Sequence, residues 1–242
     1  MSRVYVIVEG PSEEAFVSGP LATHLWSNQV YTVPIVLGVP GHKGGNTSYV
    51  RVEKDILRQL KQDAGSYCTM MVDYYGLGKG FPGTPAPIHL DNVRKVEHIE
   101  RAVKHDICRK IPEFRPDARF IPYLSLHEYE ALLFSDPDAF AKSIGQPALA
   151  SRFHRVLRDF PTPEDINSGP ETHPSKRVID IYTPYKKVIE GTQAAQAVGI
   201  QRMREKCVHF STWLQQLEAL PELRSDYRGS GIGSPISRIA SK

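Results

Sequence analysis

Residues 4–14 of the chain read VYVIVEGPSEE, and this stretch decides the fold. Residues 4–8 are all β-branched or aromatic, which predicts a short strand. The turn Glu9-Gly10-Pro11-Ser12 follows at once, and Ser12 can cap a helix. From residue 13 to residue 26 the apolar side chains recur at roughly helical spacing, and Gly19-Pro20 predicts a kink or a division into two pieces. The chain therefore opens with a strand, a turn and a helix.

The same alternation of apolar runs and amphipathic segments continues along the chain. We predict further strands over residues 30–37, 67–72 and 120–126, and helices over residues 50–60 and 93–107. Pro34 places the 30–37 strand near an edge of the sheet, because proline cannot donate a hydrogen bond to a neighbouring strand. Short runs that are apolar on both faces suit parallel strands joined by right-handed crossovers. The predicted fold class is therefore α/β, with a parallel sheet flanked by helices.

The character of the sequence changes after residue 126, because no further strand pattern follows. We predict helices over residues 127–134, 137–144, 176–181, 193–198, 202–206 and 210–217. The organisation that we expect is an α/β core (1–135), a helical extension packed on it (136–223) and a polar, poorly ordered tail (224–242).

The composition is that of an ordinary globular protein. Of the 242 residues, 40% are hydrophobic and 24% charged, so the chain can bury a sizeable core. A formal charge of +3 permits a nucleic-acid partner without requiring one. Cys68, Cys108 and Cys207 form no CxxC pair, so neither a zinc site nor a disulfide framework is indicated. Without a signal-peptide pattern, and without the ~18 apolar residues that span a bilayer, we expect a cytoplasmic protein with no membrane partner.

Acidic residues follow three of the four predicted strands. Glu9 ends the first strand, Asp73 ends the third, and Glu128 and Glu130 follow the fourth. Glu13 lies one helical turn beyond Glu9. In open α/β sheets the chemistry collects at the carboxyl ends of the strands, so these side chains are candidates for one site.

Crowded carboxylates repel one another unless a cation neutralises them. Mg²⁺ and Mn²⁺ prefer such hard oxygen ligands and can activate a water molecule for attack on a phosphate. An isolated acid after a strand is most often a solvated loop residue or a helix cap. The pattern by itself leaves both interpretations open, a metal site for phosphoryl chemistry and a set of solvated acids.

The stretch Val8-Glu9-Gly10-Pro11-Ser12-Glu13-Glu14 resembles the opening motif of Toprim domains. In the overcoming-lysogenization-defect branch of these domains, a strand is followed by Glu-Gly and by a second Glu four residues on. Over residues 3–218 the chain is similar to a bacterial Toprim-like group, domain-of-unknown-function family 4276. The segments that carry the wider resemblance are residues 7–10, 43–45, 72–76, 81–83, 127–134, 167–171 and 174–177.

The resemblance implies a nuclease-like Toprim fold, often encoded beside an ABC-type or AAA-type ATPase in anti-phage defence loci. It implies that Glu9 is the first metal ligand or the general base, with Glu13 beside it, and that Asp73 is the first acid of an Asp-x-Asp motif. The sequence departs from the family pattern at Tyr75, which replaces the second aspartate. Glu128 or Glu130 could supply the missing ligand. Two residues apart on a helix they face different directions, so we expect one of them in the site and favour Glu128.

Basic and aromatic residues offer further candidates. Lys43, in a Gly-rich loop, could approach a phosphate or lie in a plain surface turn, and we include it in the catalytic and nucleic-acid-binding sets. Lys176, Arg177 and Lys187 could follow a nucleic-acid backbone or form a solvated helix face. Tyr75, with its neighbour at position 74, could stack on bases, although aromatic residues after a buried strand usually pack.

The leading hypothesis is a Mg²⁺- or Mn²⁺-dependent endonuclease that hydrolyses DNA or RNA, tRNA included. It would act as the effector of an anti-phage defence system with an ABC-type or AAA-type ATPase partner. One alternative is a non-catalytic Toprim-like subunit that binds nucleic acid or scaffolds the ATPase; another is a different phosphoryl-transfer enzyme. The sequence leaves open the substrate, the number of metal ions and the oligomeric state, a homo-oligomer included.

Overall fold

The structure is a computed structural model that describes residues 1–38, 47–166 and 173–220. Lys43, the 167–171 segment and the 224–242 tail, for which predictions were made, lie outside these ranges. Within the described ranges, no helix combines the length and the apolar character needed to cross a membrane.

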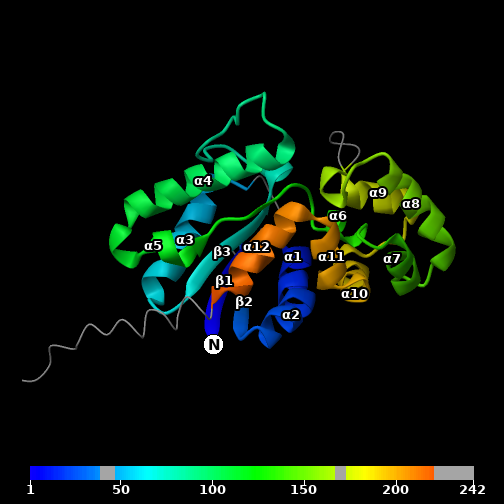
Figure 1. The fold of residues 1–242 in the computed structure, drawn as a ribbon, viewed down its shortest axis with the longest axis horizontal. Helices are drawn as coiled ribbons and strands as arrows, with labels where there is room; N and C mark the ends of the chain where they lie inside the picture. Colours follow the sequence, from blue (N-terminus) through cyan, green and yellow to red (C-terminus); the bar gives the residue numbers. More distant parts are fainter. Residues whose placement is uncertain (39–46, 167–172, 221–242) are drawn as a thin grey trace, which may run out of the picture.

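A parallel sheet forms the centre of the molecule (Figure 1). Its strands are β1 (Ser2–Val8), β2 (Val30–Val36), β3 (Tyr67–Asp73), β4 (Phe120–Ile121) and β5 (Leu124–Ser125). The order is β2-β1-β3-β4, β5 also pairs with β3, and every pairing is parallel. The predicted α/β class is confirmed, and Pro34 does lie in an edge strand, β2. Because all strands run the same way, Val8 and Asp73 end β1 and β3 at the same edge.

The fourth predicted strand is interrupted. Residues 120–126 were expected to form one strand, but the structure has β4 and β5 with Pro122 between them. β4 pairs with Cys68 and Thr69, and β5 pairs with Val72 and Asp73. Proline has no backbone N–H to donate, which accounts for the break in the ladder.

Helices cover both faces of the sheet (Figure 1). On one face α3 (Tyr49–Gln62) and α4 (Asn92–Lys110) pack over Ile7. On the other face α1 (Pro11–Phe16), α2 (Ala22–Ser27) and α12 (Val208–Glu218) pack over Val6 and Val8. The alternation of side chains along β1 therefore divides the interior into two layers, as expected for a strand buried on both faces.

The first helical segment changes its helix type where a kink or a division into two pieces was predicted. Between α1 and α2 lies a π-helix, Val17–Leu21, that contains Pro20. The wider π-helical turn makes room for the proline ring and tolerates its missing N–H, so the chain continues as a helix past Pro20. Ser12 does not cap α1, contrary to our prediction, because Gly10 occupies the cap position and Ser12 is buried inside the helix.

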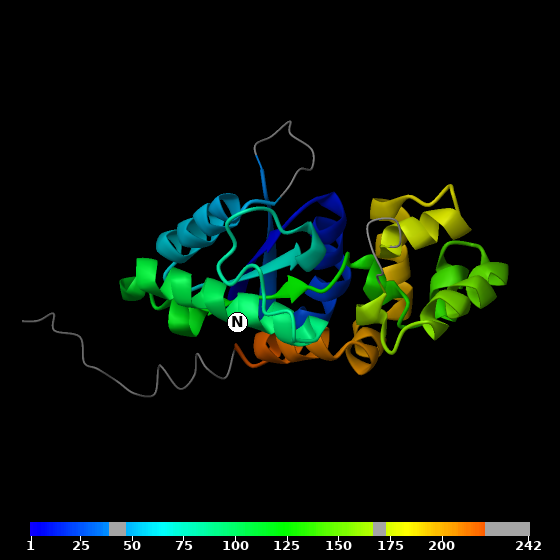
Figure 2. The ribbon, with the colours of Figure 1, turned by 90° about the horizontal axis from the view of Figure 1, so that it is seen from above.

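The second half of the chain is helical. Its helices are α6 (Glu130–Leu133), α7 (Pro137–Ser143), α8 (Ala150–Arg158), α9 (Pro174–Ile181), α10 (Lys187–Val198) and α11 (Ile200–Lys206), while the short α5 (Pro116–Arg119) precedes β4. Figure 2 shows the green and yellow helices of this half beside the sheet, at one end of the molecule. Helix α8 was not predicted from the sequence, and α10 begins at Lys187 rather than at residue 193. The predicted domain boundaries stay predictions.

Gly191 explains how α10 approaches the rest of the protein so closely. A Cβ atom at this position would lie 2.0 Å from Tyr129 Oη and 2.7 Å from Tyr185 Oη. A methyl group at this position would force the two tyrosine side chains to shift, so glycine, which weakens isolated helices, suits this close packing.

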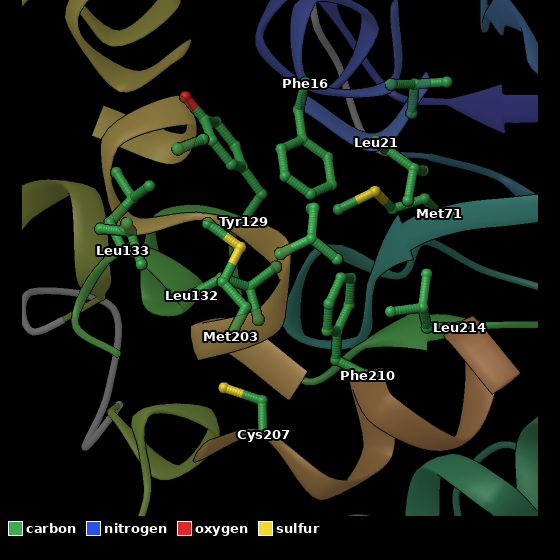
Figure 3. Close-up of a cluster of buried hydrophobic side chains, with 14 of the residues drawn as sticks. Phe16, Leu21, Met71, Tyr129, Leu132, Leu133, Met203, Cys207, Phe210 and Leu214 are labelled. Carbon is green, nitrogen blue, oxygen red and sulfur yellow. The ribbon is translucent and has the colours of Figure 1, made fainter. Parts of the chain in front are cut away.

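A shared apolar cluster joins the helical half to the sheet (Figure 3). Phe16 of α1 lies 5.6 Å from the Tyr129 ring and 6.4 Å from the Phe210 ring, measured between centroids. Trp213 of α12 donates a hydrogen bond of 2.9 Å to Thr69 Oγ1 on β3. These contacts hold the segment before α6 and helix α12 against α1 and the sheet.

Candidate functional site

Glu9 and Asp73 meet at the carboxyl edge of the sheet, as the sequence predicts. Glu9 follows β1, and its Oε1 accepts a hydrogen bond of 2.9 Å from the backbone N–H of Asp73, the last residue of β3. Gly76, in the turn after β3, lies against the same carboxylate, because a Cβ atom there would be 3.7 Å from both Glu9 oxygens. The two strand ends therefore place two carboxylates in one small region.

Glu13 joins this pair from the first turn of α1, where it is buried. Burial raises the pKa of Glu9 to about 7; hydrogen bonds from Asp73 and Thr47 oppose the shift, and the charge of Glu13 adds to it. Burial and the charges of Glu9 and Glu13 raise the pKa of Asp73 well above its usual value. Burial also raises the pKa of Glu13. This negative region would therefore be stabilised by a cation.

Lys187, the first residue of α10, brings one positive charge to the acid cluster. We give this name to Glu9, Glu13 and Asp73 together with Glu128 and Glu130. Its Nζ lies 3.1 Å from Glu128 Oε1 and 3.3 Å from Glu130 Oε2. Burial lowers the pKa of Lys187, but the charges of Glu130, Glu128 and Glu13 outweigh burial and raise it. The ammonium group therefore faces carboxylates, a different setting from the nucleic-acid contact that we predicted for it.

Glu128 is held by several donors at once. Its oxygens accept hydrogen bonds from the backbone N–H of Ser175 (2.8 Å), the Ser175 hydroxyl (2.9 Å) and Lys187 (3.1 Å), and His173 Nδ1 lies 3.0 Å away. Although burial opposes ionisation, Lys187 and Ser175 lower the pKa of Glu128 to about 2. Both oxygens are occupied, so Glu128 anchors the first turn of α9 and positions Lys187. We do not retain it as a metal ligand.

Glu130 is fully buried, with 0% of its side chain exposed. Among the residues whose positions are described, neither of its oxygens finds a hydrogen-bond partner, because the contact with Lys187 is an ion pair without hydrogen-bond alignment. Burial raises the pKa of Glu130 to about 8. We expected only one of Glu128 and Glu130 to face the site, on the premise that both lie on one helix. Glu128 precedes α6 instead of lying on it, so both acids reach Lys187.

Tyr75 occupies the position of the missing second aspartate. Its ring stacks on His127, with centroids 4.8 Å apart and planes at 19°, and meets Tyr74 edge-on at 5.0 Å. His127 is buried, and burial lowers its pKa to about 4 even though Asp165 and Glu128 oppose the shift. A neutral aromatic pair therefore borders the acids where the family pattern has a carboxylate.

The other predicted basic residues lie on α9. Lys176 Nζ is 3.0 Å from Asp180 Oδ1, and the Arg177 guanidinium lies 5.0 Å from the centroid of the Phe160 ring. Ser175, which binds Glu128, was not among the residues predicted from the sequence. The order His-Pro-Ser at residues 173–175 could have indicated it, because proline favours the first turn of a helix and exposes the following N–H groups to an anion.

The donors suit a divalent metal in kind but are not assembled around one. Over residues 1–38, 47–166 and 173–220, no three His, Cys, Asp or Glu side chains are arranged to hold an ion. Glu9, Glu13 and Asp73 nevertheless offer the hard oxygen ligands that Mg²⁺ and Mn²⁺ prefer, and burial, with a smaller contribution from neighbouring acids, raises the pKa of each. Binding would require their side chains to turn toward a common point.

A cavity of about 340 Å³ lies elsewhere, between α4 and α12. Its lining includes Glu100, Tyr123, His209 and Trp213, and none of the strand-end acids. Inside it His209 Nε2 lies 2.9 Å from Glu100 Oε1, which also accepts the backbone N–H of Leu124. This buried pair links α12 to α4 and is separate from the acid cluster.

Comparison with known proteins places most of the chain in one family model. The model described as Domain of unknown function (DUF4276) matches residues 8–218, and no curated protein matches the chain. The C-terminal region of the OLD protein of Xanthomonas campestris pv. campestris is 10% identical, covers 93% of this chain and 98% of its own, and has a TM-score of 0.44. The C-terminal region of the Burkholderia pseudomallei OLD protein is 14% identical, covers 91% of this chain and 98% of its own, and has a TM-score of 0.45.

Proposed function

This chain belongs to the DUF4276 family, and from its acid cluster we propose that it is a Mg²⁺- or Mn²⁺-dependent nuclease that hydrolyses phosphodiester bonds. The observation that carries the proposal is the meeting of Glu9, Glu13 and Asp73 at the carboxyl edge of the sheet, with pKa values raised above the usual range. Carboxyl groups kept this close are costly in isolation and are stabilised by a divalent cation. The Toprim-like resemblance stated from the sequence supports the same chemistry.

Glu9 and Asp73 would hold the ion, with Glu13 as the third carboxylate. When bound, the ion supplies a Lewis acid that polarises the phosphate and lowers the pKa of a bound water molecule. Glu9 also keeps its backbone contact with Asp73, which orients one of its oxygens along the end of β3. The protein's contribution is therefore to hold oxygen donors on two adjacent strands, where backbone pairing limits their movement.

Lys187 would be the positive group beside the ion. Without a cation its charge attracts Glu9, Glu13 and Asp73 as well as its two close partners. Once a cation neutralises the strand-end acids, the ammonium can attract a substrate phosphate. Glu128, fixed by Ser175 at the start of α9, keeps Lys187 in place for that contact.

The wider role is proposed on the family resemblance alone. We propose that the nuclease is the effector of an anti-phage defence system and that an ABC-type or AAA-type ATPase restrains it until infection is sensed. The family resemblance leaves DNA and RNA, including tRNA, as candidate substrates.

A cleavage assay tests the nuclease. Purified protein is incubated with supercoiled plasmid, with tRNA and with p-nitrophenyl phosphate, in Mn²⁺ or in EDTA, alone and with the ATPase. We expect cleavage of one nucleic acid in Mn²⁺, none in EDTA, and none by Glu9→Gln, which removes a charge while leaving an oxygen to accept the Asp73 N–H. Glu14→Gln is the matched control, because Glu14 is an exposed glutamate in the first turn of α1, next to Glu13, and loses the same charge. It should cleave normally.

The same assay separates the alternatives. Binding of nucleic acid without cleavage under every condition would favour the non-catalytic subunit, which Tyr75 in place of the second aspartate and the unassembled donor set both allow. Turnover of p-nitrophenyl phosphate alone would indicate a different phosphoryl-transfer enzyme. Equal cleavage by wild type and Glu9→Gln would exclude the proposed catalytic role of Glu9.

A further inference from the structure

Tyr75 stands at the border of the acid cluster. It lies two residues beyond Asp73, in the 3-10 turn Tyr74–Gly76 that follows β3. The next residue, Gly76, lies against the Glu9 carboxylate. A short, tight turn thus links Tyr75 to both strand ends, so a nucleic-acid strand with a phosphate at Glu9 and Asp73 would lie near this residue.

The ring is held in place although it is exposed. Tyr75 is 55% exposed, whereas His127, on which its ring stacks, is only 3% exposed. Tyr74 meets the ring edge-on from another side, with planes at 67°. Aromatic residues after a buried strand usually pack inside, but this one combines a fixed orientation with a largely open surface. Fixing a side chain before binding lowers the entropy that binding costs.

The acids and the ring differ in what they can recognise. Strand-end carboxylates with a cation interact with phosphate groups, which every nucleotide carries and which hold no information about base pairing. A flat ring supported from behind recognises the face of a base. In a duplex both faces of an internal base are already stacked on neighbouring bases, so such a ring can accept only a base that is unpaired or turned out of the helix.

We propose that Tyr75, supported by His127, is a stacking platform for a nucleobase, and that the substrate is therefore a strand with unpaired bases next to the bond that is cut. The inference rests on the proposed nuclease function and specifies its class of substrate. A base on Tyr75 would extend an existing stack, with the base, the Tyr75 ring and the His127 ring as successive layers. Its position would select which phosphate lies at Glu9 and Asp73.

Binding is measured apart from cleavage. Fluorescence anisotropy in EDTA and in Ca²⁺ follows a labelled single-stranded DNA, an RNA of the same sequence, and a blunt duplex of that DNA. Tyr75→Ala should weaken binding of a single strand by about 5- to 150-fold, the usual effect of losing one base–aromatic stack, and should leave duplex binding unchanged. Tyr75→Phe and Tyr75→Trp keep a ring and should bind within about twofold of wild type or more tightly.

Two controls make the test specific. Tyr31→Ala removes another exposed ring, 48% exposed on the edge strand β2, and should not change binding. In the second control, a single abasic site is moved along the strand. At one position it should weaken binding to wild type, and in Tyr75→Ala that position should cause no further loss, because base and ring act as one pair.

The outcomes distinguish this inference from the nuclease itself. Equal single-strand binding by wild type and Tyr75→Ala, equal weakening of single strand and duplex, or an abasic effect that persists in Tyr75→Ala each overturns the platform, whether or not the protein cleaves in Mn²⁺. Failure of wild type to bind any single strand overturns it as well. Coupled loss at one base, with no cleavage in Mn²⁺ either alone or with the ATPase, supports the platform and rejects the nuclease.

Discussion

Replacing Lys187 by methionine removes the ammonium group that lies between Glu128 and Glu130. Removing one partner of a fully buried ion pair costs about 3–5 kcal/mol, and removing one from an exposed pair costs at most about 1 kcal/mol. The Lys187 side chain is 35% exposed while Glu130 is 0% exposed, so an intermediate loss of about 2 kcal/mol is expected. In a chain of 242 residues that corresponds to a melting temperature lower by about 4–8 °C.

The loss should depend on pH through Glu128. Lys187 and Ser175 hold the pKa of Glu128 at about 2, below its usual 4.5, even though burial opposes them. A carboxyl group with a lowered pKa stabilises the fold above its usual pKa, and that stability disappears as the pH falls through the lowered value. The share that Lys187 contributes should therefore be complete at pH 7.5 and smaller at pH 4.

Urea unfolding, followed by circular dichroism in EDTA, measures this loss. Lys186→Met is the matched control, because Lys186 is the exposed neighbour at the start of α10 and carries the same charge near the same helix end. Lys187→Arg keeps the positive charge, so its free energy of unfolding should lie much closer to that of wild type than that of Lys187→Met does. If Lys187→Met and Lys186→Met have equal free energies of unfolding at pH 7.5, the ammonium group is not coupled to the acids and the proposed charge balance of the cluster is refuted.

Three further predictions concern packing, pH and metal. Gly191→Ala should lower the free energy of unfolding by about 1–3 kcal/mol, because the new Cβ would meet Tyr129 Oη at 2.0 Å, and Tyr129→Phe should recover part of the loss in a urea titration; an additive double variant would contradict this. Glu100 raises the pKa of His209 although burial lowers it, so the pair's stabilisation is complete below pH 6.5, the usual His value, and is lost as the pH rises. His209→Gln should therefore melt with a weaker pH dependence than wild type between pH 6 and 9, and identical slopes would exclude the pair as the cause. Mn²⁺ at about 100 times its Kd should stabilise wild type by about 2.7 kcal/mol and Glu9→Gln by much less in a thermal melt, whereas equal stabilisation would place the ion elsewhere.

Most of the sheet could be predicted from the sequence. The strands that begin near residues 2, 30 and 67 are apolar runs bounded by turns, and the interruption of the α-helix around Gly19-Pro20 follows from proline geometry. These features are local, because each depends on a residue and its near neighbours. The prediction of one fourth strand was wrong because its pairing with β3 is not a local property. Pro122 has no N–H to donate, and the strand is divided into β4 and β5 at this residue.

The candidate site was predictable only in part. Position at the end of a strand placed Glu9 and Asp73 together, since parallel strands end at one edge. No comparable rule connects Glu128 to Lys187, which are 59 residues apart, or to Ser175, which is 47 residues away. Helical spacing even suggested the wrong relation between Glu128 and Glu130, because Glu128 lies before the helix begins.

The sequence alone determined the alternation of strands and helices, the family and the two strand-end acids, because hydrophobic periodicity and turn chemistry act between near neighbours. Only the tertiary structure decided the charge balance and the borders of the site. Helix α10 packs against Tyr129, where Gly191 permits the close approach, and this packing places Lys187 beside Glu128. The tertiary structure also stacks the Tyr75 ring on His127. Such contacts depend on how distant surfaces pack, and burial then shifts the pKa of each group beyond what its neighbours in the sequence indicate.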